Sequence, residues 1–262
     1  MRKTSLPMLV LLVLGCGNDI ASNHQASKTS FTNQRTQHSN KEEQGSWQYF
    51  LQHLPMKDAP ILDYRGRPVA DQEKHVAVLN YDVGHSDLQQ CADALMRLRA
   101  EYLFQEKRYD EIGFHFVNGS YYSWKSFCRG QRPVASGNSV HFVQGKNSDY
   151  IHESLREYLD LVYAYASTIS LARELKPADD FDIGTVVIHP GSPGHCFIII
   201  DKASDGNGNT RFKLAEGYTP AQSIYVLRNL DESGKNPWYY LKKGIIETAS
   251  YRFSDYQLKK FE

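Results

Sequence analysis

The chain has 262 residues, of which 41% are hydrophobic, 12% aromatic and 23% charged. This composition can bury a sizeable core and excludes a wholly disordered protein. Thirty Lys and Arg residues balance thirty Asp and Glu residues. No net field therefore attracts polyanions, and no nucleic-acid partner is expected.

The N-terminus has the features of a secretory signal. Two basic residues precede a mostly apolar run of nine residues, 6–14, whereas a transmembrane helix requires about 20 apolar residues. The run ends in Gly15 and Cys16. This pattern resembles the bacterial lipobox, in which the cysteine is lipidated and becomes the mature N-terminus. The alternative is ordinary cleavage nearby, with Cys16 left as an incidental thiol.

We therefore expect residues 1–15 to be removed and acyl chains on Cys16 to anchor the protein to a membrane. Gly17 follows this cysteine in place of Asp, which favours the outer membrane of the cell envelope, facing the periplasm. Residues 16–44 then combine the anchor with a tether rich in Ser, Asn, Gln, Thr and Lys. Such a segment cannot bury enough apolar surface to order itself, so a single globular domain is expected over 45–262.

In chain order, this domain begins with a short amphipathic helix over 47–54 and a strand over 75–81. Apolar residues at helical spacing predict a helix over 88–104, followed by a strand over 112–117. Residues 118–146 are rich in turn formers and are expected to be an irregular insertion. Helical spacing returns over 153–175, which predicts one helix of 23 residues.

Strand patterns dominate the second half of the chain, at 184–188, 196–200 and 211–216, with a Gly, Asn and Asp turn over 204–209. The order of these elements predicts an α+β fold in which an antiparallel sheet is packed by two principal helices. No internal repeat is visible.

Glu216 is expected to point to the same face of its strand as the apolar residues. A buried carboxylate on that face requires a partner. Pairing Asp201 with Arg211 across the hairpin places Glu216 opposite Cys196, and a shift of one residue places it opposite His195. Glu216 and His195 are neighbours in either register, but the register decides whether they share a face. A carboxylate beside an imidazole orients the ring and stabilises its charged form.

Cys91 is the candidate nucleophile because it lies early in the helix predicted from residue 88, where the helix dipole lowers a thiol pKa. With Asp87 as N-cap, Cys91 is the fourth helical residue and the effect is weak; a start near Gln89 places it at the tip. A purely structural role remains open for each of the three residues. Cys91 could be a small buried hydrophobe, His195 a loop-closing residue bonded to backbone, and Glu216 an ion-pair partner of Arg97 or Arg99.

Four stretches, 75–79, 87–103, 193–195 and 218–222, resemble the bacterial lipoprotein family called domain of unknown function 4846. The resemblance covers nearly the whole of the domain. It implies kinship with exported bacterial lipoproteins and transfers no activity or cofactor.

The order of Cys91, His195 and Glu216 along the chain is also similar to that in papain-like cell-wall amidases and peptidases. In those enzymes a cysteine comes first, a histidine second and a polar residue third. That resemblance implies thiolate attack by Cys91, acid and base work by His195, and orientation by Glu216. It also implies the Cys91 N–H as a donor in the oxyanion hole, with Gln89 and Gln90 as further candidate donors. The function expected is a cell-envelope cysteine hydrolase acting on cell-wall peptide or another amide. A non-catalytic envelope binding or scaffold lipoprotein, contacting peptidoglycan or an envelope protein, is the alternative.

No cofactor is expected, and metal sites are poorly supported. His189 and His195 are six residues apart without a second ligand pair, and residues 205–216 match only part of the EF-hand spacing. Aromatic residues could stack on saccharides but are more often core; they are Tyr121, Tyr122, Trp124, Trp238, Tyr239 and Tyr240. Two of the three thiols Cys91, Cys128 and Cys196 could be bridged in an exported protein, and a bridge at Cys91 would exclude the nucleophile.

Overall fold

The computed structural model describes residues 42–262. The expected signal peptide 1–15, Cys16 and the tether as far as residue 41 lie outside the described residues. The first helix, α1 (Trp47–Gln52), begins where the pattern predicts, because the Ser46 hydroxyl accepts the Tyr49 N–H at 3.1 Å. This cap satisfies one of the free N–H groups of the first turn.

A nine-stranded sheet forms the centre of the fold, and each of its neighbouring strands pairs antiparallel. In spatial order its strands are β1 (Met56–Lys57), β2 (His75–Leu79), β11 (Tyr225–Leu227), β10 (Thr210–Glu216), β9 (His195–Ser204), β8 (Thr185–His189), β15 (Gln257–Lys260) and β7 (Lys176–Pro177), with β12 (Trp238–Tyr239) also paired to β10.

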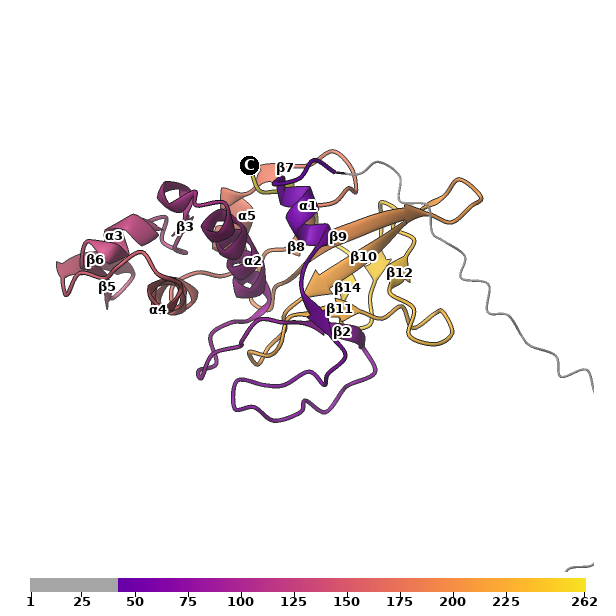
Figure 1. Ribbon diagram of the computed structural model, residues 1–262, viewed down its shortest axis with the longest axis horizontal. Coiled ribbons are helices and arrows are strands. Elements are labelled where there is room, and N and C mark those ends of the chain that lie inside the picture. Colours follow the sequence, from indigo (N-terminus) through magenta and orange to yellow (C-terminus); the bar gives the residue numbers. More distant parts are fainter. Residues whose placement is uncertain (1–41) are drawn as a thin grey trace, which may run out of the picture. The chain divides into compact units, whose positions relative to one another are not determined.

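Helices cover one face of this sheet (Figure 1). The two longest are α2 (Cys91–Gln105) and α4 (His152–Tyr163), and α5 (Thr168–Glu174) lies beside them. The fold is therefore α+β with an antiparallel sheet and two principal helices, as the sequence predicts. None of the helices within residues 42–262 is long and apolar enough to cross a membrane.

The two faces of the sheet carry separate cores because successive side chains of a strand point to opposite sides. Ile198 and Ala215 pack in the helical core with Leu95 and Leu98. Phe197 packs on the opposite face, in a second core that includes the small hairpin of β13 (Ile246–Glu247) and β14 (Arg252–Phe253). Strand β9 is the interior strand predicted from its continuous apolar run, and it contributes side chains to both cores.

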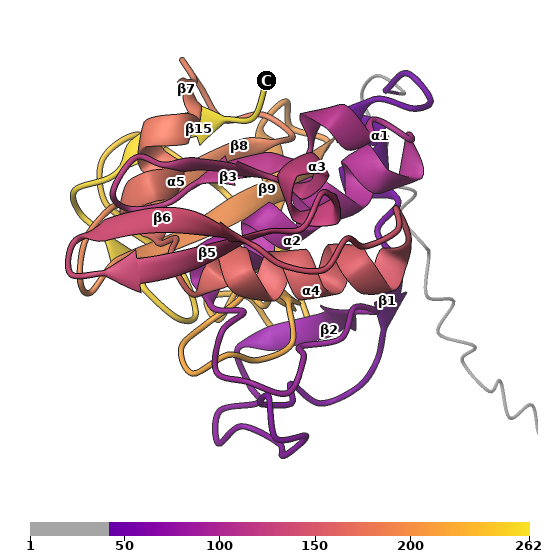
Figure 2. The same ribbon diagram turned by 90° about the vertical axis from the view of Figure 1, so that its left-hand side faces the viewer.

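The expectation of an irregular insertion over 118–146 is wrong. Strand β4 (Tyr121–Ser123) pairs with β3 (Gly113–His115), helix α3 (Trp124–Cys128) follows, and β5 (Gln131–Ser136) pairs with β6 (Ser139–Gln144). Figure 2 shows this last hairpin beside α4. Its side chains are mostly exposed, so it lacks the apolar alternation that marks a half-buried strand. A short 3₁₀ helix, η1 (Tyr109–Glu111), precedes β3.

The single helix expected over 153–175 is also wrong, because α4 ends at Tyr163 and α5 begins at Thr168. Ser167 causes the restart. Its hydroxyl accepts the Ile169 N–H, and its own N–H donates to the Ser170 hydroxyl, both at 3.0 Å. These local bonds compete with the helical ladder and form a new N-cap in the middle of an apolar periodicity.

Candidate active site

A β-bulge in the β9–β10 hairpin places Glu216 and His195 on one face of the sheet. Near the turn, Lys213 pairs with Asp201, but beyond it Leu214 pairs with Ile199, so one residue of β9 has no partner. Continuing this register places Glu216 opposite Phe197, two residues from His195 and on its side of the strand. Without the bulge, Glu216 and His195 would point to opposite faces of the sheet. The register differs from the one expected, yet the two side chains meet.

Glu216 is fully buried and makes two side-chain hydrogen bonds. One oxygen lies 2.8 Å from His195 Nε2, and the other accepts the hydroxyl of Tyr225 on β11. Neither Arg97 nor Arg99 is its partner: Arg97 binds Asp82 and Glu101, and Arg99 binds the backbone carbonyl of Glu262.

Aromatic rings fix the orientation of the His195 imidazole. Its centroid lies 5.1 Å from the Tyr218 ring, 4.9 Å from Tyr251 and 5.7 Å from Phe253. With Nε2 bonded to Glu216, Nδ1 is the ring nitrogen that remains for a second partner. His195 is therefore not a loop-closing residue bonded to backbone.

Cys91 is the first residue of α2, and Gln90 is the N-cap. The helix begins three residues later than expected because the Gln90 N–H donates to the Asp93 carboxylate at 3.0 Å, which caps the helix at this point. The thiol therefore lies at the tip of the helix, where the positive end of the dipole acts on it. It is mostly buried, with 8% of the residue exposed.

Cys91 and His195 line the same cavity, of about 560 Å³, at the N-terminal end of α2. Gly191, Ser192, Pro193 and Gly194 of the β8–β9 loop line it beside them. The glycine at 194 is required, because a Cβ there would lie 2.4 Å from the Thr168 hydroxyl. The turn after β10, the N-terminus of α5 and the C-terminal segment also line it, through Tyr218, Thr219, Ser167, Thr168 and Tyr251.

The electrostatics favour a charged pair at this cavity. Hydrogen bonding to Cys196, followed by the hydrogen bond and charge of His195, lowers the pKa of the Cys91 thiol well below its usual value, although burial opposes this. For His195, burial disfavours the charged ring, but Cys91 and Glu216 outweigh it and raise the pKa to about 9. At neutral pH the geometry therefore supports a thiolate and an imidazolium.

The two candidate oxyanion donors have different positions. The Gln89 side chain is buried and contacts Arg97 and the Asp82 carbonyl, and it does not line the cavity. The Gln90 side chain lines the cavity, but its amide nitrogen donates to Asp87 at 3.2 Å. The backbone N–H of Cys91 is better suited, since the first N–H groups of a helix have no intrahelical acceptor.

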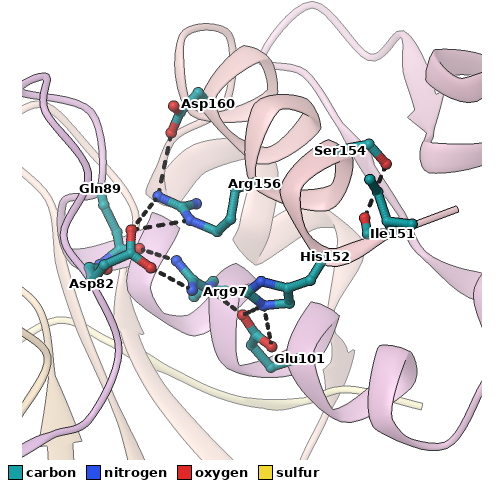
Figure 3. A network of polar contacts seen from close by, with 9 residues as sticks. All are labelled: Asp82, Gln89, Arg97, Glu101, Ile151, His152, Ser154, Arg156 and Asp160. Carbon is teal, nitrogen blue, oxygen red and sulfur yellow. Dashed lines mark hydrogen bonds and ion pairs between the residues drawn. The ribbon is translucent and has the colours of Figure 1, made fainter. Parts of the chain in front are cut away.

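Gln89 belongs instead to a charge network between α2 and α4 (Figure 3). Arg97, of which 1% is exposed, donates to Glu101 at 2.5 Å and to Asp82 at 2.9 Å. Arg156 of α4 joins at Asp82, and His152 lies 2.9 Å from Glu101. The network connects the two principal helices with the segment that precedes α2.

Several site residues were not expected from the sequence. Tyr225, which binds Glu216, has the pattern of an ordinary strand aromatic, and Asp93 that of a polar helix residue. Cys196 is expected from the sequence only as a disulfide candidate, yet burial, followed by its interaction with Cys91, raises the pKa of its thiol well above the usual value. Cys91, Cys128 and Cys196 are all free in the structure.

The aromatic residues considered for saccharide contact do not line this cavity. Trp124 and Tyr122 lie in the helical core, and Tyr121 and Tyr240 are exposed elsewhere. Within residues 42–262, no three His, Cys, Asp or Glu side chains are grouped so that they could hold a metal ion.

A family model described as Domain of unknown function (4846) matches residues 28–260. The chain belongs to this family. The match includes every residue that lines the cavity, as well as Glu216 and Tyr225. A search of curated proteins and a search of solved structures each gave no match.

Proposed function

We propose that this member of the family is a cysteine hydrolase of the bacterial cell envelope that cleaves an amide bond, such as one in cell-wall peptide. The observation that carries the proposal is that Glu216 bonds to His195 and that His195 and Cys91 line one cavity, where the Cys91 Sγ lies 3.9 Å from the carbonyl oxygen of Gly194, the residue before His195. Each residue has the neighbour that its role requires: a buried carboxylate at 2.8 Å from the imidazole, and an imidazole and a helix N-terminus beside the thiol.

In this proposal the Cys91 thiolate attacks the carbonyl carbon of the amide, and the negative charge that develops on the oxygen is stabilised by the Cys91 N–H. His195 gives its proton to the leaving amine, which produces a thioester. His195 then takes a proton from water, whose oxygen attacks the thioester and releases the acid and the thiol. Glu216 holds the ring and supports its positive charge throughout, and Tyr225 holds Glu216.

The cellular part of the proposal rests on the first residues of the chain. We propose that Cys16 carries lipid, that residues 16–44 tether the domain, and that the enzyme faces the periplasm from the outer membrane. An amide of peptidoglycan is a substrate within reach of such a tether. The Gly–Cys junction after a short apolar run supports this placement.

The test is hydrolysis of purified muropeptides by the domain and by Cys91→Ala. We expect the substitution to reduce the rate by about 10⁴-fold or more, since removing a nucleophile removes the step that depends on it. Cys128→Ala is the matched control, because Cys128 is a buried free thiol that does not line the cavity and donates to the Asp149 carbonyl at 3.8 Å. Equal turnover by Cys91→Ala and the unsubstituted protein, with both folded by circular dichroism, would refute the proposal.

A further inference from the structure

The wall of the cavity contains a buried carboxylate with an unsatisfied oxygen, two residues after Cys91. Asp93 lines the cavity and is 6% exposed. One of its oxygens accepts the Gln90 N–H at 3.0 Å, whereas Oδ1 is buried without a hydrogen-bond partner in the described part of the chain. Capping of α2 explains why the first oxygen is buried, but it gives no reason for the burial of Oδ1.

A second unsatisfied polar atom lies in the same wall. Tyr163, at the end of α4, also lines the cavity and is 5% exposed, and its hydroxyl has no hydrogen-bond partner among residues 42–262. Burial is the main cause of the raised pKa of Tyr163; the charges of Arg97 and Arg156 oppose it, and the charge of Asp93 makes a smaller contribution to the rise. Two buried polar groups from different helices thus share one wall and both require a partner.

Arg97 is the nearby cation, but it does not bind Asp93 Oδ1 or the Tyr163 hydroxyl. Arg97 lies one helical turn after Asp93, but Asp82, Gln89 and Glu101 bind its guanidinium. Among residues 42–262, those that line the cavity include no Lys or Arg, and the acidic ones are Asp87 and Asp93. Burial, together with the charge of Cys91, raises the pKa of the Asp93 carboxyl well above its usual value. A cation beside Oδ1 would offset that cost and stabilise the charged form, so this wall of the cavity favours a positively charged occupant.

We propose that Asp93 and Tyr163 form a subsite for a cationic amino group that the substrate carries close to its scissile amide. This inference rests on the proposed function, since it names the class of substrate for the same site. The ammonium donates to Asp93 Oδ1 and to the Tyr163 oxygen, and it supplies the charge partner that a buried carboxylate requires. Substrates with a blocked amine or a carboxylate at this position are excluded by the same groups.

The test uses two thiol reagents of opposite charge, 2-aminoethyl and 2-sulfonatoethyl methanethiosulfonate. In each reaction the Cys91 thiolate attacks the reagent's sulfenyl sulfur, a disulfide bond to Sγ forms, and methanesulfinate leaves with the electron pair of the broken bond. Mass analysis of the peptide that contains Cys91 gives the rates, and each rate is divided by the rate of the same reagent with 2-mercaptoethanol.

We expect the normalised rate for the cation to exceed that for the anion by about tenfold, as a charge-assisted pair allows. Asp93→Asn keeps the acceptor that caps α2 but removes the charge, so the ratio should fall at least about fivefold. Tyr163→Phe removes the second partner and should reduce the ratio less. Asp110→Asn is the control, because this exposed carboxylate pairs with Lys125 at the surface and should leave the ratio unchanged.

Two results would overturn the inference: a ratio near one in the unsubstituted protein, or an unchanged ratio in folded Asp93→Asn. The first does not depend on any variant. The assay also separates this inference from the proposed function, because it reports the thiol and requires no hydrolysis. If the reagents show a charge preference but muropeptides are not cleaved, the proposed hydrolase function is refuted and the cation subsite is retained. If muropeptides are cleaved without a charge preference, the cation subsite is refuted and the hydrolase function is retained.

Discussion

At the scale of single residues, Glu216 acts on Cys91 through His195. Glu216 helps to raise the pKa of the imidazole, and the charged imidazole in turn helps to lower the pKa of the thiol. The thiolate and the imidazolium therefore coexist from the lowered pKa of Cys91 up to about pH 9, where His195 loses its proton. Above that pH no proton remains on the ring for a leaving amine.

Glu216→Gln should weaken this pair without removing the hydrogen-bond acceptor. The imidazole loses the carboxylate charge and its pKa falls, so the thiol loses part of its stabilising charge and its pKa rises. We expect the pH at which alkylation of Cys91 by iodoacetamide reaches half of its maximal rate to move upward, because this rate follows the thiolate fraction. The measurement is the alkylation rate of the Cys91 peptide from about pH 5 to pH 10.

Glu174→Gln is the matched control for this profile, because Glu174 also pairs with a histidine, His115, at 3.6 Å and away from the cavity. Its profile should superimpose on that of the unsubstituted protein. If the Glu216→Gln profile also superimposes, Glu216 does not influence the thiol.

The three candidate catalytic residues could be selected from the sequence because each is polar or reactive within an otherwise apolar element. Their partners could not. Tyr225 and Asp93 have side chains that are ordinary for a strand and for the first turn of a helix, so composition gives no signal for them. Their roles depend on contacts between segments that are distant in the chain, such as the bond from Tyr225 to Glu216.

At the scale of elements, apolar periodicity predicts the central strands and the main helices but not where they break. The end of α4 and the start of α5 depend on hydrogen bonds of Ser167 that leave the apolar spacing unchanged. The sequence does not predict the bulge in β9 either, because apolar residues occupy both faces of the strand at that point. The hairpin β5–β6 lies largely in solvent, where burial imposes no pattern.

The charge network between α2 and α4 gives a stability prediction for these elements. Arg97→Ala removes the buried guanidinium that Glu101 and Asp82 share, leaves only His152 and Arg156 beside them, and opens a gap in the core, so the free energy of unfolding should fall by about 3 kcal/mol. Arg108→Ala removes an arginine from an exposed pair with Glu111 and should cost at most about 1 kcal/mol. Urea denaturation of the two variants measures the difference, and similar losses would show that the network does not join the helices.

At the scale of the whole molecule, the α+β fold follows from the alternation of helical and strand patterns, because a sheet with two apolar faces must be covered on both. The sequence predicts the helical cover. It does not predict the cover of the second face, where short strands near the C-terminus and the loop that contains Ile61 pack on Phe197 and Tyr225. Such short segments have no periodicity of their own.

The proposed anchor gives a prediction for the full-length chain in a bacterial host. Cys16→Ser should move the protein from the membrane fraction to the soluble periplasmic fraction, because the acyl chains are its proposed attachment and a single serine carries none. Cys128→Ser, within the folded domain, should leave the distribution unchanged. Fractionation followed by immunoblotting measures both, and membrane retention of Cys16→Ser would refute lipidation at this position.

The bulge in β9 has a consequence for how this family can change over evolutionary time. The tip of the β9–β10 hairpin, beyond Ser204, can gain or lose residues while the paired strands remain in phase. Between the bulge and His195, however, an insertion or deletion of one residue turns Glu216 or His195 to the other side of the sheet. Length variation among relatives should therefore be concentrated at the tip, and a relative that has lost the extra residue should have replaced its acid from another strand.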